Sequence, residues 1–242
     1  MPVNNISRDQ HDPQLRDSAA IIVAAGQSSR MEGTDKVFMD LHGSTVLSFV
    51  LETFEAAPSI RNVVLVVRKD KQNLAREVVD NHEFRKVSEI CIGGNRRQDS
   101  VRNGLAKLER HRWVVIHDAA RPCLTKDLIE NGINEAIKWG SAVPAIPVTD
   151  TIKIASRNNQ VEKTLDRTTL RAAQTPQIFK LEDLERAFTK IDQTVTDEAE
   201  LMELAGFKIH LYEGLYSNIK ITTAEDVAFV EKILSDGSES HF

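Results

Sequence analysis

The feature of this sequence that most restricts its fold is a regular alternation of short apolar runs with amphipathic stretches. The apolar runs predict strands, and the stretches between them have helical spacing. Predicted strands cover residues 19–25, 61–69, 88–94, 113–122 and 141–148, and predicted helices cover 46–57, 71–82, 97–108 and 126–140. This alternation predicts an α/β protein built from βαβ units, with a mainly parallel twisted sheet flanked by helices.

One segment, residues 148–179, breaks this alternation. The stretches TIKIA and VEKTL alternate polar and apolar residues on either side of a Ser-Arg-Asn-Asn-Gln turn. That pattern predicts a projecting β-hairpin arm over residues 148–172. Strand edges on such an arm need cover, which a second subunit commonly supplies. We therefore expect a homodimer formed through the arm.

Composition excludes several classes of protein. A formal net charge of -5 gives no reason to expect nucleic acid or membrane capture. No apolar run approaches the roughly 20 residues that a membrane span needs. Cys91 and Cys123 lack metal-ligand spacing and are expected to be reduced, buried thiols of a cytoplasmic protein.

We expect one domain over residues 19–236, after a flexible polar extension (1–18) without a secretory signal pattern and before a tail (237–242).

The first predicted strand ends in a stretch suited to a polyphosphate. Gly26 permits a sharp turn, and the hydroxyls of Ser28 and Ser29 add donors to the backbone N–H groups of the loop. Arg30 and Lys36 add positive charge. The spacing matches neither GxxxxGK[ST] nor GxGxxG, which weakens kinase-like and dinucleotide-oxidoreductase interpretations. The alternative is an ordinary loop with solvated cations.

A second motif, GGNRRQDSV at residues 93–101, could read a nucleotide base. Its two glycines allow a planar group to approach the backbone, and Asn95 and Ser100 can hydrogen-bond to a base. The alternative is a glycine turn followed by a helix capped at Asp99 or Ser100.

A third motif, VVIHDAARP, places a carboxylate at the end of a buried strand. Asp118 is expected at the same rim of the sheet as Gly26, where a triphosphate would bring Mg²⁺ within its reach. Arg121 is placed for a second phosphate, and His117 is interpreted as a packed residue and not a base. Alternatively, Asp118 only bonds to loop amides and pairs with Arg121.

Together with LDRTTL, QTPQIF, TDEAELME and EGLYSNIKIT, these motifs resemble the 2-C-methyl-D-erythritol 4-phosphate cytidylyltransferases of the non-mevalonate isoprenoid pathway. The motifs appear in the family's order and cover residues 19 to about 234. The resemblance implies a Rossmann-like nucleotidyltransferase fold, CTP as substrate and Mg²⁺ or another divalent cation as cofactor.

The resemblance also implies roles for individual residues. Arg30, Lys36, Arg167 and Lys220 would be catalytic, and Asp118 would hold the metal. The nucleotide would contact Ala24, Ala25, Gly26, Gly94, Asn95, Ser100 and Asp118. The methylerythritol phosphate would lie among Arg121, Thr151, Arg167, Thr175, Thr196 and Lys220. Because the family's arm crosses to the partner, Thr151 and Arg167 would act in the neighbouring subunit's site.

The reaction that the resemblance implies is attack of the acceptor's phosphate oxygen on the α-phosphorus of CTP, with release of pyrophosphate. A phosphate monoester is already a nucleophile, so positioning and charge neutralisation suffice. The alternatives are a pentitol-phosphate cytidylyltransferase, such as one for ribitol 5-phosphate, and a non-catalytic nucleotide-binding homologue. The chain departs from the family's usual Pro-Lys-Gln with Asp35-Lys36-Val37. Asp35 could pair with the lysine or lower the local positive potential.

Overall fold

The computed structural model describes residues 17–26, 35–108 and 110–238. The predicted extension, except for its last two residues, lies outside the described residues. So do Ser28, Ser29 and Arg30 of the predicted phosphate loop, and the last four residues of the predicted tail. Strand β1 begins at Ser18 and helix α8 ends at Ser238, so regular structure extends slightly beyond both predicted domain boundaries.

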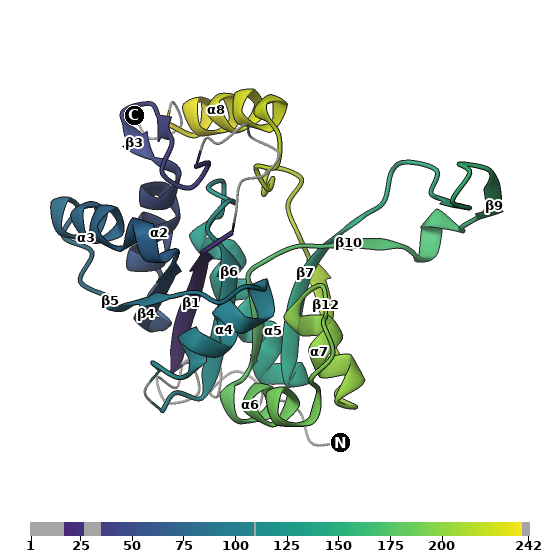
Figure 1. The fold of residues 1–242 in the computed structure, drawn as a ribbon, viewed down its shortest axis with the longest axis horizontal. Helices are drawn as coiled ribbons and strands as arrows, with labels where there is room; N and C mark the ends of the chain where they lie inside the picture. Colours follow the sequence, from purple (N-terminus) through teal and green to yellow (C-terminus); the bar gives the residue numbers. More distant parts are fainter. Residues whose placement is uncertain (1–16, 27–34, 109, 239–242) are drawn as a thin grey trace, which may run out of the picture.

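The body of the protein is an eight-stranded sheet with the order β10-β7-β11-β6-β1-β4-β5, in which β12 also pairs with β7 (Figure 1). The strands are β1 (Ser18–Ala24), β4 (Ile60–Val67), β5 (Val87–Ile92), β6 (Trp113–Asp118), β7 (Ser141–Pro147), β10 (Arg171–Ala173), β11 (Gln177–Lys180) and β12 (Leu211–Glu213).

Most of the sheet is parallel. β1 pairs in parallel with β4 and β6, and β4 pairs in parallel with β5. β11 is antiparallel to both β6 and β7, so β6 and β7 run in the same direction on either side of it. The mainly parallel sheet predicted from the sequence is confirmed, but the antiparallel strand β11 was not anticipated.

Successive residues of a strand point to opposite faces of the sheet. Both faces therefore carry apolar side chains, and helices cover each face. Ala20 and Ile22 of β1 pack with α2 (Val46–Ala56), α3 (Gln72–Asn81) and α5 (Lys126–Trp139). Ile21 between them packs with α4 (Arg97–Leu105), α6 (Leu181–Lys190) and α7 (Glu198–Leu204). A third cluster joins α8 (Ala224–Ser238) to α2 and to the loop after β6. The predicted helices therefore flank the sheet as expected.

The remaining elements are short. β8 (Lys153–Ala155) and β9 (Val161–Thr164) form a separate antiparallel pair, followed by the 3-10 turn η2 (Arg167–Thr169). Figure 1 shows this pair extending away from the body, at the right of the view. β2 (Asp40–Leu41) pairs with β3 (Ser44–Thr45), and η1 (Lys69–Lys71) precedes α3.

Two further expectations concern the cysteines and the absence of a membrane-spanning segment. Cys91 and Cys123 are free and buried. Within the described ranges, no helix has the length and apolar character to cross a bilayer.

Candidate active site

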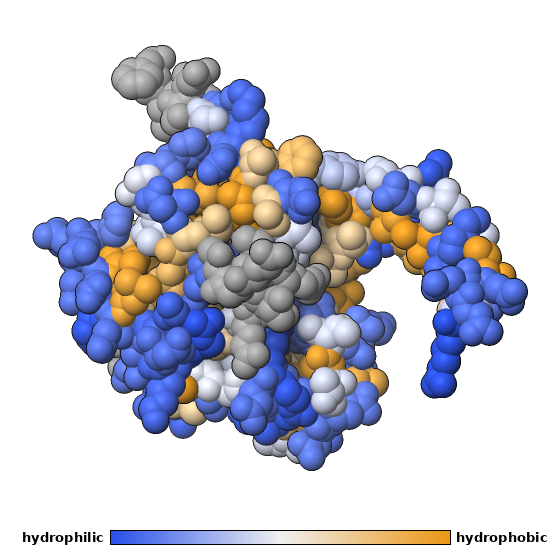
Figure 2. Space-filling model, turned by 45° about the horizontal axis from the view of Figure 1, so that its top comes forward, coloured by the Kyte–Doolittle hydropathy of each residue, from blue (hydrophilic) through white to orange (hydrophobic). Residues whose placement is uncertain are grey.

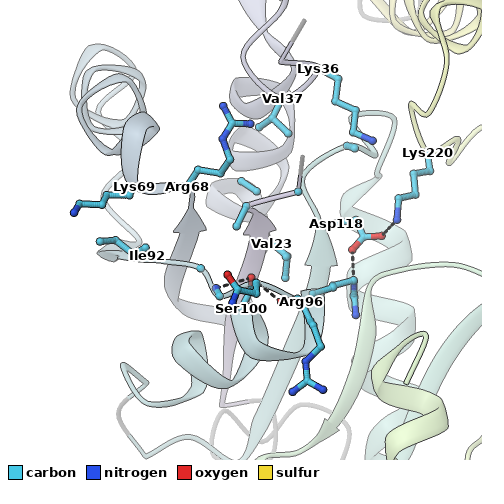
Figure 3. Close-up of a pocket in the computed structure, with 18 residues that line it drawn as sticks. Val23, Lys36, Val37, Arg68, Lys69, Ile92, Arg96, Ser100, Asp118 and Lys220 are labelled. Carbon is cyan, nitrogen blue, oxygen red and sulfur yellow. Dashed lines mark hydrogen bonds and ion pairs between the residues drawn. The ribbon is translucent and has the colours of Figure 1, made fainter. Parts of the chain in front are cut away.

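A cavity of about 510 Å³ opens at the carboxyl ends of β1, β4, β5 and β6. Ligands of open parallel sheets bind beyond these strand ends. All seven residues predicted to contact the nucleotide line this cavity: Ala24, Ala25, Gly26, Gly94, Asn95, Ser100 and Asp118. Lys36 and Lys220 line it as well (Figure 3). The fold therefore brings Gly26 and Lys36, at the two ends of the predicted phosphate loop, together with the base loop.

The glycines of the base loop are required by close packing. A Cβ on Gly93 would overlap the Cβ of Ala25 and lie 2.7 Å from the hydroxyl of Ser100. A Cβ on Gly94 would overlap the Cβ of Asp99. The backbone N–H of Gly94 donates to Ser100 Oγ at 3.1 Å. Gly93 thus lets the loop lie against the residue that follows β1, and Gly94 lets it lie against the start of α4.

Neither Asp99 nor Ser100 is the N-cap residue of α4, which is Arg96, but both have structural roles. Asp99 accepts a hydrogen bond from the Arg96 N–H at 3.1 Å and caps the start of α4. The Ser100 hydroxyl donates to the Arg96 carbonyl at 3.2 Å. Because that hydroxyl bonds to both Gly94 and Arg96, Ser100 stabilises the conformation of the base loop.

Lys36 and its neighbour Asp35 have separate partners. The ammonium of Lys36 donates to the carbonyl of Ile221 at 2.8 Å, which ties it to the chain segment that carries Lys220. The carboxylate of Asp35 lies 3.0 Å from Arg68 Nη2 and 3.9 Å from Lys71 Nζ. Asp35, which directly precedes Lys36, is thus paired with an arginine that lines the cavity.

Asp118 is the most heavily engaged carboxylate of the site. It is 7% exposed, and its two oxygens accept hydrogen bonds from Arg97 Nε at 2.9 Å and from Lys220 Nζ at 2.7 Å (Figure 3). Burial by itself would raise the pKa of Asp118. The positive charges of Arg97 and Lys220 outweigh burial and hold that pKa far below its ordinary value. Asp118 is therefore ionised at neutral pH.

A second, smaller cavity of about 180 Å³ adjoins the first. Arg121, Thr175 and Thr196, which were predicted to surround the acceptor, all line it. Arg97, Asp118 and Lys220 line both cavities and form the boundary between them.

A hydrogen-bonded chain behind the second cavity fixes the loop after β6. His117 Nε2 lies 3.2 Å from the Arg121 carbonyl, which can only accept, so Nε2 carries the proton. His117 Nδ1 then accepts from the Thr175 hydroxyl at 3.0 Å, and the same hydroxyl oxygen accepts from the Asp118 N–H at 3.1 Å. Burial lowers the pKa of His117 to about 3. His117 is a neutral, packed residue, as predicted.

The other acceptor-side residues are also engaged with the protein. Arg121 Nη1 donates to the Asn218 carbonyl at 2.7 Å, and burial lowers the pKa of Arg121. The Thr196 hydroxyl donates to Glu200 at 2.8 Å. These contacts fix the side chains at the rim of the second cavity.

Two predicted residues lie on the arm and not at either cavity of this subunit. Thr151 and Arg167 are exposed, and Arg167 Nη1 donates to the Thr149 carbonyl at 2.6 Å. Their place in a neighbouring subunit's site stays a prediction.

Sequence reasoning missed Arg97 and Glu198. Arg97 Nη1 donates to both carboxylate oxygens of Glu198, at 2.8 and 2.6 Å, while its Nε contacts Asp118. Arg97 is the second arginine of the GGNRRQDSV motif, and Glu198 follows the predicted Thr196. The available signal was that each stands at the start of a helix.

Comparisons with known proteins agree with this geometry. Residues 18–236 match the family model "IspD: 2-C-methyl-D-erythritol 4-phosphate cytidylyltransferase". The protein of that name from Dehalococcoides mccartyi strain CBDB1 is 44% identical over 218 residues, which are 90% of this chain and 96% of the relative. The one from Clostridium acetobutylicum is 38% identical, over 91% of this chain and 99% of the relative.

Solved structures of the same kind share the fold. The 4-diphosphocytidyl-2C-methyl-D-erythritol synthase of Anaerococcus prevotii superposes with a TM-score of 0.81 at 29% identity, over 95% of this chain and all of that one. The 2-C-methyl-D-erythritol 4-phosphate cytidylyltransferase of Francisella tularensis gives 0.76 at 31% identity, over 90% of this chain and 99% of that one. The chain therefore belongs to the 2-C-methyl-D-erythritol 4-phosphate cytidylyltransferase family.

Proposed function

We propose that this protein transfers CMP from CTP to 2-C-methyl-D-erythritol 4-phosphate, giving 4-diphosphocytidyl-2-C-methyl-D-erythritol and pyrophosphate, and that it works in the cytoplasm. The observation that carries the proposal is the pair of adjoining cavities with a cationic boundary. CTP occupies the larger cavity, and the sugar phosphate occupies the smaller one. A phosphate oxygen of the acceptor forms a bond to the α-phosphorus, and the bond from that phosphorus to the leaving pyrophosphate breaks.

The charges of the site support a reaction driven by positioning and electrostatics. Lys36, Arg97, Arg121 and Lys220 line the two cavities, where negative charge gathers on the phosphates. His117 has a pKa of about 3 and both its ring nitrogens are engaged, so it is unsuited to act as a general base. An acceptor phosphate needs none. Arg30, which lies outside the described residues, is proposed to hold the triphosphate with Lys36.

The donor set fits Mg²⁺ only as an ion that arrives with the nucleotide. Among the described residues, no three His, Cys, Asp or Glu side chains gather as a metal site. Asp118 lines both cavities and can supply one carboxylate oxygen once Lys220 turns to a phosphate. Mg²⁺ commonly takes one or two carboxylates and completes its shell with phosphate oxygens and water. When bound, the ion neutralises phosphate charge.

A homodimer through the arm is part of the proposal. The arm carries exposed apolar side chains, with Ile154 43% and Val161 60% exposed, and Figure 2 shows apolar surface along it. In a dimer this surface would be covered, and Thr151 and Arg167 would reach the partner's acceptor cavity. A monomeric mass in light scattering at micromolar concentration would contradict this.

The test of the activity is pyrophosphate release from CTP and Mg²⁺ with two acceptors compared in parallel. Release with 2-C-methyl-D-erythritol 4-phosphate and not with ribitol 5-phosphate is expected. Release with ribitol 5-phosphate alone would keep the CTP cavity and reassign the acceptor cavity. Binding of CTP by calorimetry without release with either acceptor would identify a non-catalytic homologue.

A further inference from the structure

Arg97 and Glu198 connect the two sides of the proposed reaction site. Arg97 is the first residue of α4 and directly follows the base loop. Glu198 is the first residue of α7 and directly follows Thr196 and Asp197, which line the smaller cavity. The ion pair between them therefore joins a loop of the nucleotide cavity to a loop of the acceptor cavity.

The contacts of the Arg97 guanidinium are divided between two carboxylates. Nε donates to Asp118 and Nη1 donates to Glu198. Nη2 is buried and has no hydrogen-bond partner within the described residues. The orientation of this cation thus depends on Asp118 at the cavity boundary and on Glu198 behind it.

Glu198 differs from Asp118 in its access to the site. Its side chain is 1% exposed, and it lies outside the lining of both cavities. Gln177 on β11 holds the start of the same helix, since its amide oxygen accepts from the Ala199 N–H at 3.1 Å and its amide nitrogen donates to Asp197 at 2.8 Å. Glu198 is therefore fixed in place and can act on substrates only through Arg97.

We infer that Glu198 is a positioning residue, which holds Arg97 against Asp118 and so sets the position of the acceptor cavity relative to the bound nucleotide. The inference rests on the proposed function. Removing one partner of a buried ion pair leaves the other charge uncompensated. Without the Glu198 carboxylate, Asp118 is the one partner that remains to Arg97 among the described residues, and the boundary between the two phosphates loses its fixed geometry.

The test uses the full chain with Glu198→Gln, with Arg97→Lys, and with both changes. E198Q is expected to lower kcat tenfold or more, after correction for the folded fraction, with a change in KM for CTP of less than threefold. The loss in the double variant is expected to match that of the poorer single variant, because both changes remove the same contact. Glu203→Gln, on the exposed face of α7, is the matched control with wild-type kinetics. A kcat for E198Q within twofold of wild type, or losses that multiply in the double variant, would overturn the inference.

A readout without substrates separates this inference from the proposed activity. The arginine Nε–H NMR signal of Arg97, assigned by its loss in R97K, is expected to move in E198Q and to stay in place in E203Q. An unmoved signal in E198Q refutes the inference, whereas a wild-type protein that releases no pyrophosphate refutes the proposed function alone. Should E198Q not fold, Glu198→Asp keeps the charge with a shorter reach. A wild-type kcat in E198D, with an unmoved Arg97 signal, would also refute the inference.

Discussion

Acidification is expected to destabilise this protein between pH 7 and pH 5 through a single buried histidine, His117. Its pKa is about 3 in the folded protein, because burial disfavours the charged ring, and 6.5 is the ordinary value. Below pH 6.5 the unfolded chain binds a proton that the folded protein does not bind until about pH 3. The free energy of unfolding therefore falls as the pH falls through this window.

The magnitude follows from the difference in pKa. Each unit corresponds to about 1.36 kcal/mol, so the full window contributes about 5 kcal/mol. Only the part between pH 6.5 and 5 is sampled on going from pH 7 to pH 5, which gives about 2 kcal/mol. Asp118 acts in a lower window: its folded pKa is depressed, so its contribution is fully present above its ordinary value of 3.8 and is lost below it.

The assay is urea unfolding at pH 7 and pH 5, followed by circular dichroism, for the wild type and for His117→Gln. The wild type is expected to lose about 2 kcal/mol more than the variant between the two pH values. His117→Gln lowers stability at pH 7, since Phe54 and Thr175 lose a packed and hydrogen-bonded ring, but only the difference between pH values is compared. Equal pH dependence in the two proteins would refute a buried neutral His117.

Three further changes test other parts of the site. Lys36→Ala is expected to lower kcat a hundredfold or more, about 3 kcal/mol of barrier, because the cavity loses a fixed cation; near-wild-type pyrophosphate release would contradict this. Gly93→Ala forces a Cβ onto that of Ala25, so calorimetry is expected to show at least tenfold weaker CTP binding, and an unchanged Kd would argue against the close packing. Asp35→Asn removes the ion pair with Arg68 and is expected to cost up to about 1 kcal/mol in urea unfolding; the same loss in 1 M salt as in 0.1 M salt would count against an electrostatic role.

The grouping of the residues that were predicted to contact the nucleotide could be foreseen, because they follow strands of one parallel sheet. Gly26, Gly94 and Asp118 each come directly or almost directly after an apolar run, and parallel strands bring their carboxyl ends to one rim. Hydrophobic pattern and glycine position were enough to place them together.

The acceptor side was less predictable because its contacts depend on elements far apart in the chain. Residues 174–179 fall in the segment that breaks the βαβ pattern, so nothing local showed that β11 inserts between β6 and β7. That insertion sets Thr175 against Asp118 and places α7 so that Glu198 meets Arg97. Likewise, the sequence offered Lys36 as a partner for Asp35. The fold instead brings Arg68, which is distant in the sequence, next to Asp35.

The two cavities are lined largely by different parts of the chain, which has a consequence for redesign and for evolutionary change. The larger cavity is lined by residues between 23 and 120 together with Lys220. Within the described structure, a second group of six residues lines only the smaller cavity: Ala173, Gln174, Thr175, Gln177, Thr196 and Asp197. In the proposed function, variation in this second group would change the acceptor cavity, while the larger cavity, which is proposed to hold CTP, keeps its sequence. A library confined to those six positions would therefore ask how readily one cytidylyltransferase scaffold acquires a new acceptor.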